Sequence, residues 1–139
     1  AMSAMLPYLS EDQKDISDAF IMLVKKVLPY QREDGFFSWQ LSAMEGPADS
    51  SATAMIAYAM KQSLLMDEST GFNRCSETNE YKQKVQTAVE NATEALLGAA
   101  DENGVGQCLA ECEGYAQYPQ VYGKYPWSLG MTVALLYLE

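Results

Sequence analysis

The chain contains no histidine. It has nine lysine and arginine residues against nineteen aspartates and glutamates, which gives a net charge of −10. Without histidine it has no Cys–His pair for nucleophilic catalysis and no imidazole for a zinc site. The shortage of positive charge argues against nucleic acid and anionic membrane surfaces as partners, because both are bound through clustered Lys and Arg. These absences exclude several classes of function before any motif is considered.

Cysteines and long apolar runs are also scarce. An odd count of three cysteines does not suit the disulfide framework of a small secreted domain. Cys108 and Cys112 are four residues apart but lack a second pair of ligands, so no metal and no other cofactor is expected. No stretch reaches the roughly 18 apolar residues of a membrane span, and the N-terminus lacks the pattern of a signal peptide. We therefore expect a cytoplasmic chain, unless a leader has been removed.

What is present is mainly helical periodicity, in a chain short enough for a single domain over residues 1–139. An amphipathic helix is predicted over residues 10–28, with a capping box at its start and Pro29 at its end. A second amphipathic helix is predicted over about residues 77–97, with Gly98 following its C-terminal cap. The buried stripe predicted for the first helix consists of Ile16, Phe20, Leu23, Val24, Val27 and Leu28.

Two further predicted helices, residues 52–66 and the segment from Pro126 onward, are apolar on nearly every face. A helix of that kind is expected to be buried on every side. Alternation typical of a strand is weak and confined to residues 104–109. The two helix types therefore alternate along the chain. We expect the amphipathic helices to lie outside and the apolar helices to lie inside.

A glycine-marked loop precedes each apolar helix. E-D-G at 33–35 leads to Gln40 and E-N-G at 102–104 leads to Gln107, a repeat offset of about seventy residues. We therefore predict an all-α fold of two helical hairpins in two layers, forming an arc of an α/α toroid. The alternative is an ordinary four-helix bundle, which accounts less well for two buried helices.

Four segments together resemble a known family. They read LPYQREDGFFSWQ, DSSATAMIAYAM, GVGQC and GKYPWSLGMTVALLYLE, and they are similar to the unsaturated glucuronyl and rhamnogalacturonyl hydrolases of glycoside hydrolase families 88 and 105. The resemblance implies an (α/α)6 toroid of six hairpins, of which this chain matches only the C-terminal part. It also implies a chemistry in which one Asp protonates the C4–C5 double bond of an unsaturated uronic acid and water adds, without a metal.

The part of the family that carries this chemistry has no counterpart here. The catalytic Asp and a second essential Asp of the family lie in its first half, and its active-site His is absent. No catalytic residue is therefore assigned, and whether the chain is an enzyme stays open. The resemblance implies a fragment that is inactive alone and takes unsaturated uronic acid-containing oligosaccharides. The alternative is a non-catalytic carbohydrate-binding or protein-interaction module; another kind of α/α toroid, epimerase- or cyclase-like, fits less well.

Candidate substrate-binding residues lie at the predicted mouths of the two apolar helices. Trp39 and Gln40 could present an aromatic face and an amide to a sugar ring, or they could pack and tie down their own loop. Asp49 and Ser51 could bind sugar hydroxyls, although helix capping is the simpler interpretation.

The last loop before the C-terminal helix is rich in aromatic residues, which supply large amphipathic surfaces. Tyr122, Tyr125 and Trp127 are the candidates there, with Trp127 nearest any pocket; filling the interior of the loop is the alternative role.

A two-hairpin arc would also leave apolar flanks uncovered. We therefore predict a homo-oligomer, or pairing with a missing N-terminal segment.

Overall fold

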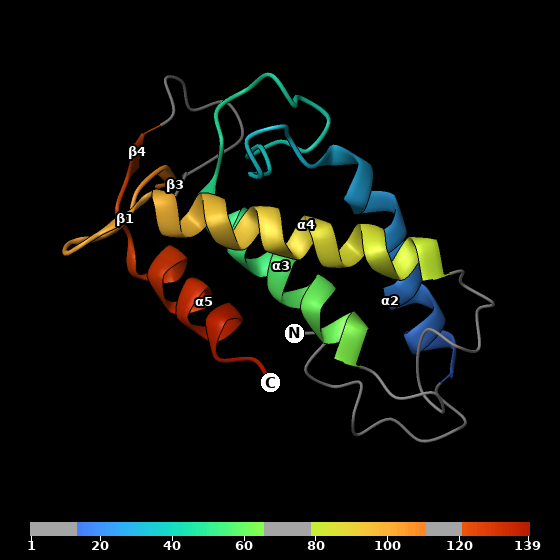
Figure 1. The fold of residues 1–139 in the computed structure, drawn as a ribbon. Coiled ribbons are helices and arrows are strands. Elements are labelled where there is room, and N and C mark those ends of the chain that lie inside the picture. The colour runs from blue at the N-terminus through green and yellow to red at the C-terminus, as the bar shows by residue number, and fades with distance from the viewer. Residues whose placement is uncertain (1–13, 66–78, 111–120) are drawn as a thin grey trace.

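The computed structural model describes residues 14–65, 79–110 and 121–139 of the 139-residue chain (Figure 1). Within them the fold is mostly helical with a few short strands, so the predicted helical class is confirmed. The elements in chain order are α2 (Lys14–Val27), the 3-10 turn η3 (Leu28–Tyr30), α3 (Ser50–Leu65), α4 (Asn79–Gly98), β1 (Ala100–Asp101), β2 (Gly104–Val105), β3 (Cys108–Leu109), β4 (Tyr122–Gly123) and α5 (Pro126–Leu136).

The helix boundaries follow the sequence pattern closely where they are described. α3 begins two residues before the predicted start, and its predicted end at residue 66 lies outside the described residues, as does the predicted capping box of the first helix. Pro29 lies in η3, directly after α2, because proline cannot continue the helical hydrogen-bond pattern. Gly98 was predicted to follow the cap, but it is the last residue of α4 and its φ is not positive.

α3 is the inner helix of the described structure. It packs closely against α4 and α5 and only lightly against α2 (Figure 1). Its buried positions are largely small residues, among them Ala54, Ala57 and Ser63, which let neighbouring helices approach closely. The core is completed by side chains from the other elements, including Phe20, Ile21, Val24, Phe37, Val85, Ala92, Leu96, Val105 and Leu135.

Two details of the apolar pattern differ from expectation. Leu23 was predicted in the buried stripe of the first helix but is 51% exposed, whereas Ile21 is buried in the core. The predicted edge of α2 does face α3, since Leu23 lines an apolar pocket together with Ile56 and Met60, but α3 does not cover it completely. α5 is covered on the side of α3, while Leu129 and Val133 on its other side are exposed.

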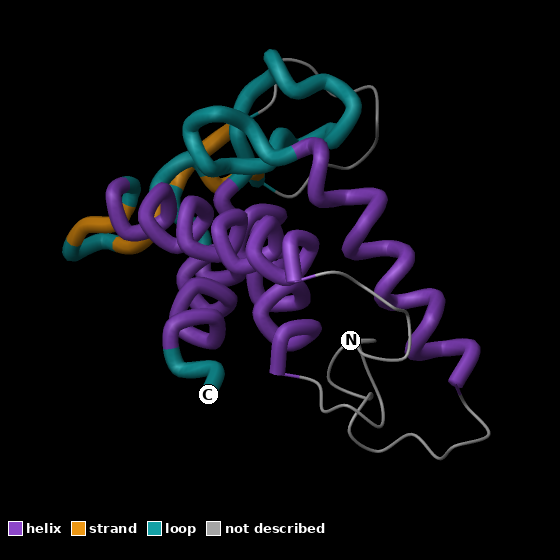
Figure 2. The backbone as a smooth tube through the Cα atoms, turned by 45° about the vertical axis from the view of Figure 1, so that its right-hand side comes forward, coloured by secondary structure: helices purple, strands orange, loops and turns teal. Residues whose placement is uncertain are grey.

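The strands form two small antiparallel ladders that the sequence hardly indicated. Residues 100–101 pair with 104–105, and residues 108–109 pair with 122–123. Each strand has only two residues, too few to produce an alternating pattern that could be recognised. The ladders and the loop before α3 gather at one end of the helices, where α3 and α5 begin (Figures 1 and 2). That end carries the candidate site.

Candidate functional site

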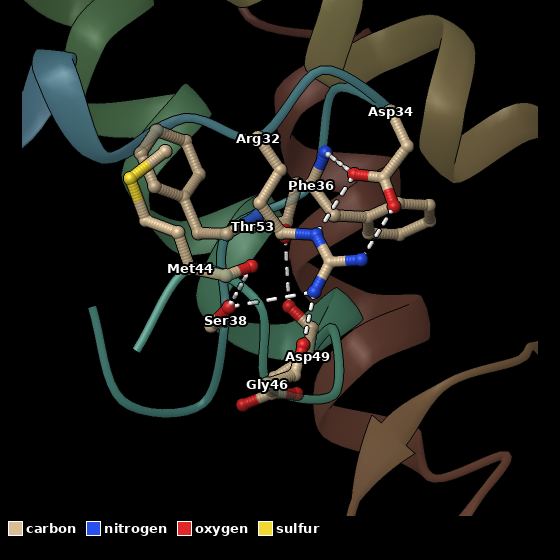
Figure 3. A network of polar contacts seen from close by, with 9 residues as sticks. Arg32, Asp34, Phe36, Ser38, Met44, Gly46, Asp49 and Thr53 are labelled. Carbon is tan, nitrogen blue, oxygen red and sulfur yellow. Dashed lines mark hydrogen bonds and ion pairs between the residues drawn. The ribbon is translucent and has the colours of Figure 1, made fainter. Parts of the chain in front are cut away.

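An arginine closes the loop that leads into α3. Arg32 Nε and Nη2 donate to the two carboxylate oxygens of Asp34, over 3.0 and 2.8 Å, in a bidentate pair. Its Nη1 donates to the carbonyl of Gly46 and lies 3.5 Å from Ser38 Oγ (Figure 3). The hydrogen bond from Arg32 lowers the pKa of the Asp34 carboxyl. One side chain therefore joins the two ends of the loop.

The side chain of Gln31 fixes the same loop to the backbone of α4. Gln31 Nε2 donates to the carbonyl of Ala88 over 2.8 Å and to that of Gly35 over 3.0 Å. Gly35 has φ +83°, and a Cβ there would lie 2.5 Å from the Asn91 carbonyl oxygen. Only glycine combines this backbone conformation with so close an approach to the helix.

Trp39 and Gln40, two of the predicted substrate-binding residues, lie in the part of the loop that projects beyond this closure. Trp39 is half-buried, and its backbone N–H donates to the Pro47 carbonyl over 3.3 Å. Gln40 is exposed, and its Nε2 lies 3.5 Å from Ser42 Oγ. Neither lines the depression around Asp49 described below.

Asp49 caps α3 and is almost fully enclosed, with 6% of its surface exposed. Its Oδ1 accepts hydrogen bonds from Ser51 N (3.0 Å), Ser51 Oγ (2.8 Å) and Leu109 N (3.2 Å). Three donors offset the cost of burying a carboxylate. Its other oxygen, Oδ2, has no hydrogen-bond partner among the residues that the structure describes.

Thr53 joins the loop to the first turn of α3. Its Oγ1 accepts from Phe37 N over 2.9 Å and donates to the Asp49 carbonyl over 2.8 Å. Asp49 N in turn donates to the Phe37 carbonyl over 2.9 Å. These bonds orient the capping residue from both sides of its backbone, as Figure 3 shows in part.

A pair of buried serines brings the first turns of α3 and α5 together. Ser50 Oγ and Ser128 Oγ are 2.7 Å apart, and both residues are fully buried. The N–H of Ser50 donates to the carbonyl of Gln107 over 3.0 Å, and Gln107 has φ 56°, uncommon for a residue with a side chain. The two helix starts and the turn before β3 thus form one polar cluster. Sequence reasoning missed the serine pair, because neither residue signals a partner 78 positions away.

Trp127 lies at the start of α5 in a fixed orientation. Its indole Nε1 donates to the Leu109 carbonyl over 3.2 Å. The Tyr125 ring stacks on it, with ring centroids 4.8 Å apart and an interplanar angle of 1°. Tyr122 is half-buried in β4, paired with Leu109. The polar atom of the indole is therefore used by the protein, and its ring offers apolar surface.

These elements enclose an open depression of about 470 Å³ lined by Asp49, Ser51, Leu109, Ala110 and Trp127. Its volume lies in the range of small-molecule sites. Of the seven predicted substrate-binding residues, the structure brings three into this lining, with Tyr125 stacked behind Trp127. A second open depression, of about 510 Å³, lies beside the loop closure and is lined by Arg32, Glu33, Asp34, Met44 and Glu45.

Cys108 lies beside this site without contributing a nucleophile. It is fully buried, and its burial, together with the negative charge of Asp49, raises the pKa of its thiol. A neutral thiol is a poor nucleophile and a poor metal ligand. Among the residues described, no group of three or more Cys, Asp or Glu side chains is placed to hold a metal ion.

The fold and the site together define a mostly helical protein with an acidic and aromatic depression where two neighbouring helices begin. The family model described as Glycosyl Hydrolase Family 88 matches residues 1–137, and the chain belongs to that family. No curated protein and no solved structure matches it. None of the helices in the described ranges is both long and apolar enough to cross a bilayer.

Proposed function

We propose that this Family 88 chain binds oligosaccharides that end in an unsaturated uronic acid, of the glucuronyl or rhamnogalacturonyl type, and does not cleave them by itself. The observation that carries the proposal is the depression in which a buried carboxylate faces an oriented indole, within a chain of a glycoside hydrolase family. Sugar rings are bound in proteins by such pairs of aromatic surface and polar group.

We base the proposed inactivity on two features of the sequence. The chain has no histidine, and its segments that resemble the family have no counterpart of the region with the catalytic Asp. Proton transfer to a substrate requires an acid within hydrogen-bond reach of the reacting atom. Asp49 is an N-cap whose Oδ1 is held by three donors, so we assign it to binding and not to proton donation.

The test uses an unsaturated disaccharide and two readouts. Loss of the ultraviolet absorbance of the C4–C5 double bond would report turnover, and calorimetry would report binding. We expect binding without turnover. Trp127→Ala should weaken binding, whereas Trp39→Ala should leave it unchanged if Trp39 only packs on its loop. Clear turnover contradicts the proposed inactivity, and absence of binding contradicts the proposal as a whole.

A second proposal concerns partners in the cytoplasm, where we expect the chain to act. The outer side of α5 exposes Leu129, Val133 and Leu136, at helical spacing that places them on one face, and Tyr137 directly after the helix is exposed as well. We propose that this face is covered in an arc of a toroid, by a second copy or by an additional N-terminal segment. Light scattering tests it: we expect the wild type to self-associate and Val133→Glu to do so less. A wild type that stays strictly monomeric contradicts coverage by a second copy.

A further inference from the structure

We propose that the depression around Asp49 is a subsite for an uncharged sugar ring and that it rejects the carboxylate of a uronic acid. The inference rests on the proposed function in one respect, namely that the ligand is an oligosaccharide. It adds that this part of the site receives a neutral sugar next to the unsaturated uronic acid and not the uronic acid itself.

The first argument is the hydrogen-bonding capacity of Asp49. Oδ1 already accepts from Ser51 N, Ser51 Oγ and Leu109 N. Oδ2 has no partner among the described residues, although 94% of the residue's surface is enclosed and it lines the depression. A carboxylate oxygen only accepts hydrogen bonds. The ligand must therefore bring a donor to this position, as a sugar hydroxyl does.

The second argument is the apolar surface of Trp127. Tyr125 covers one face of its ring, and Leu109 takes its only donor, Nε1. The 39% of Trp127 that is exposed therefore offers carbon surface to the depression. A pyranose ring has both an apolar C–H face and hydroxyl donors at its edge, so it suits this pair of groups.

The third argument is charge. No lysine or arginine is among the described residues that line the depression. Lys124, the basic residue nearest in sequence, is held in an ion pair with Asp101. A uronic acid carboxylate at this place would meet the negative charge of Asp49 without a compensating cation, and like charges repel.

The experiment compares two probes that differ only at C6, methyl β-galactopyranoside and methyl β-galactopyranosiduronate. The chain has two tryptophans, so a Trp39→Phe background makes the intrinsic fluorescence report Trp127 alone. We expect the neutral probe to bind at least about tenfold more tightly than the uronate at low salt. In Asp49→Asn the preference should fall to about twofold or less, because Asn removes the charge and places a donor or a weaker acceptor at Oδ2.

Asn is itself a good N-cap residue, so this variant is expected to fold, and circular dichroism checks that it does. Glu45→Gln is the matched control, because it removes the same charge at a residue that lines the other depression; it should keep the full preference. If Asp49→Asn does not fold, Trp127→Phe serves instead. It removes the indole and its bond to Leu109. Because it also removes the fluorescent reporter, its binding is measured by calorimetry beside the wild type, and it should weaken the neutral probe at least about threefold.

Each result has a defined meaning. Equal or tighter binding of the uronate overturns the neutral subsite. So does binding of an unsaturated disaccharide when neither monosaccharide binds, and in both cases the proposed function stands. If the disaccharide also fails to bind, both proposals fall.

Discussion

The two glycine-marked loops begin with nearly the same sequence but do different work. Gly35 and Gly104 both have positive φ, +83° and +124°, as their shared place in the repeat requires. The first loop is tied within itself by Arg32 and to α4 by Gln31. The second loop takes part in the two β ladders. Its backbone at Gln107 and Leu109 makes hydrogen bonds to the first turn of α3 and to the residue that caps it.

This difference teaches which loop builds the site. The first loop reaches the cluster only through the backbone of Phe37, which helps to orient Asp49. Its side-chain bonds at Arg32 and Gln31 hold the loop itself and fix it to α4, so changes at those residues should alter stability more than binding. A loop that supplies backbone donors and acceptors to the Asp49 and Trp127 cluster sets the geometry of that cluster. The repeat in the sequence marks both loops equally, so only the contacts distinguish the two roles. The predictions below test that distinction.

The largest effect is expected from Gly35→Ala. The substitution combines a left-handed backbone with a Cβ placed 2.5 Å from the Asn91 carbonyl oxygen, and we expect it to lower the free energy of unfolding by about 3 kcal/mol. Among the described residues, a Cβ at Gly104 meets only Lys124 Cβ, at 3.6 Å, so Gly104→Ala should cost about 1 kcal/mol. Urea denaturation measures both.

Gly98→Ala is the control for these two substitutions. Gly98 lies at the end of α4 with open space around it and no positive φ, so alanine should raise stability by about 0.5–1 kcal/mol. Equal losses for Gly35→Ala and Gly104→Ala would show that the two loops are anchored alike, against the distinction drawn here.

The next effect concerns the cap that the second loop reaches. Asp49→Ala leaves the N–H groups of Ser51 and Leu109 without their acceptor and should cost about 2 kcal/mol. Asp49→Asn keeps one acceptor oxygen and should cost less than about 1 kcal/mol. Thermal unfolding of the three proteins checks this order. If Asn destabilises as much as Ala, then the charge, and not the hydrogen-bond geometry, holds the cluster together.

Arg32→Lys tests the closure of the first loop by a smaller change. Lysine keeps the charge but cannot make the bidentate pair with Asp34 and reach Gly46 as well, so we expect a loss of about 1 kcal/mol with sugar binding unchanged. Chemical denaturation and calorimetry measure the two quantities. A large loss of sugar binding would place this loop in the site after all.

The same pair predicts a pH dependence. The folded state lowers the pKa of Asp34 below its ordinary value of 3.8, so the stabilisation is present above about that pH and is lost as the pH falls through the lower folded-state value. Arg32→Ala should therefore show a shallower loss of stability on acidification below pH 4. If the stability of the wild type and of the variant falls identically with pH, the Arg32–Asp34 pair does not contribute to stability.

Much of the helical structure could be predicted because its signals are local. Apolar spacing located α2, α3, α4 and α5, and residue type limited the cap of α3 to Asp49, Ser50 or Ser51, of which the structure shows Asp49. The exact face that α2 buries was less certain, since Ile21 and Leu23 are equally apolar and only the packing of the folded chain decides which of them is covered.

The site was predicted in part for a related reason. Asp49, Ser51 and Trp127 could be proposed from their positions at helix starts, but the sequence could not show that residues near 50, 109 and 127 meet. That meeting depends on the β3–β4 ladder and on the Ser50–Ser128 pair, which are long-range contacts between unremarkable residues. Trp39 and Gln40 had the same local signal, and the loop closure places them elsewhere.

The smallest effect is expected at the turn between the two ladders. Gln107 holds φ 56° with an exposed side chain, while its carbonyl accepts from Ser50 N. Glycine adopts this conformation without strain, although it gains freedom in the unfolded chain, so Gln107→Gly should raise stability by at most about 1 kcal/mol. Gln107→Ala keeps the strain and should be near neutral. Because only the carbonyl touches α3, both variants should bind the disaccharide as the wild type does. A loss of binding in both would instead assign the Gln107 amide to the ligand, which would give the second loop a side-chain contact in the site as well as its backbone contacts.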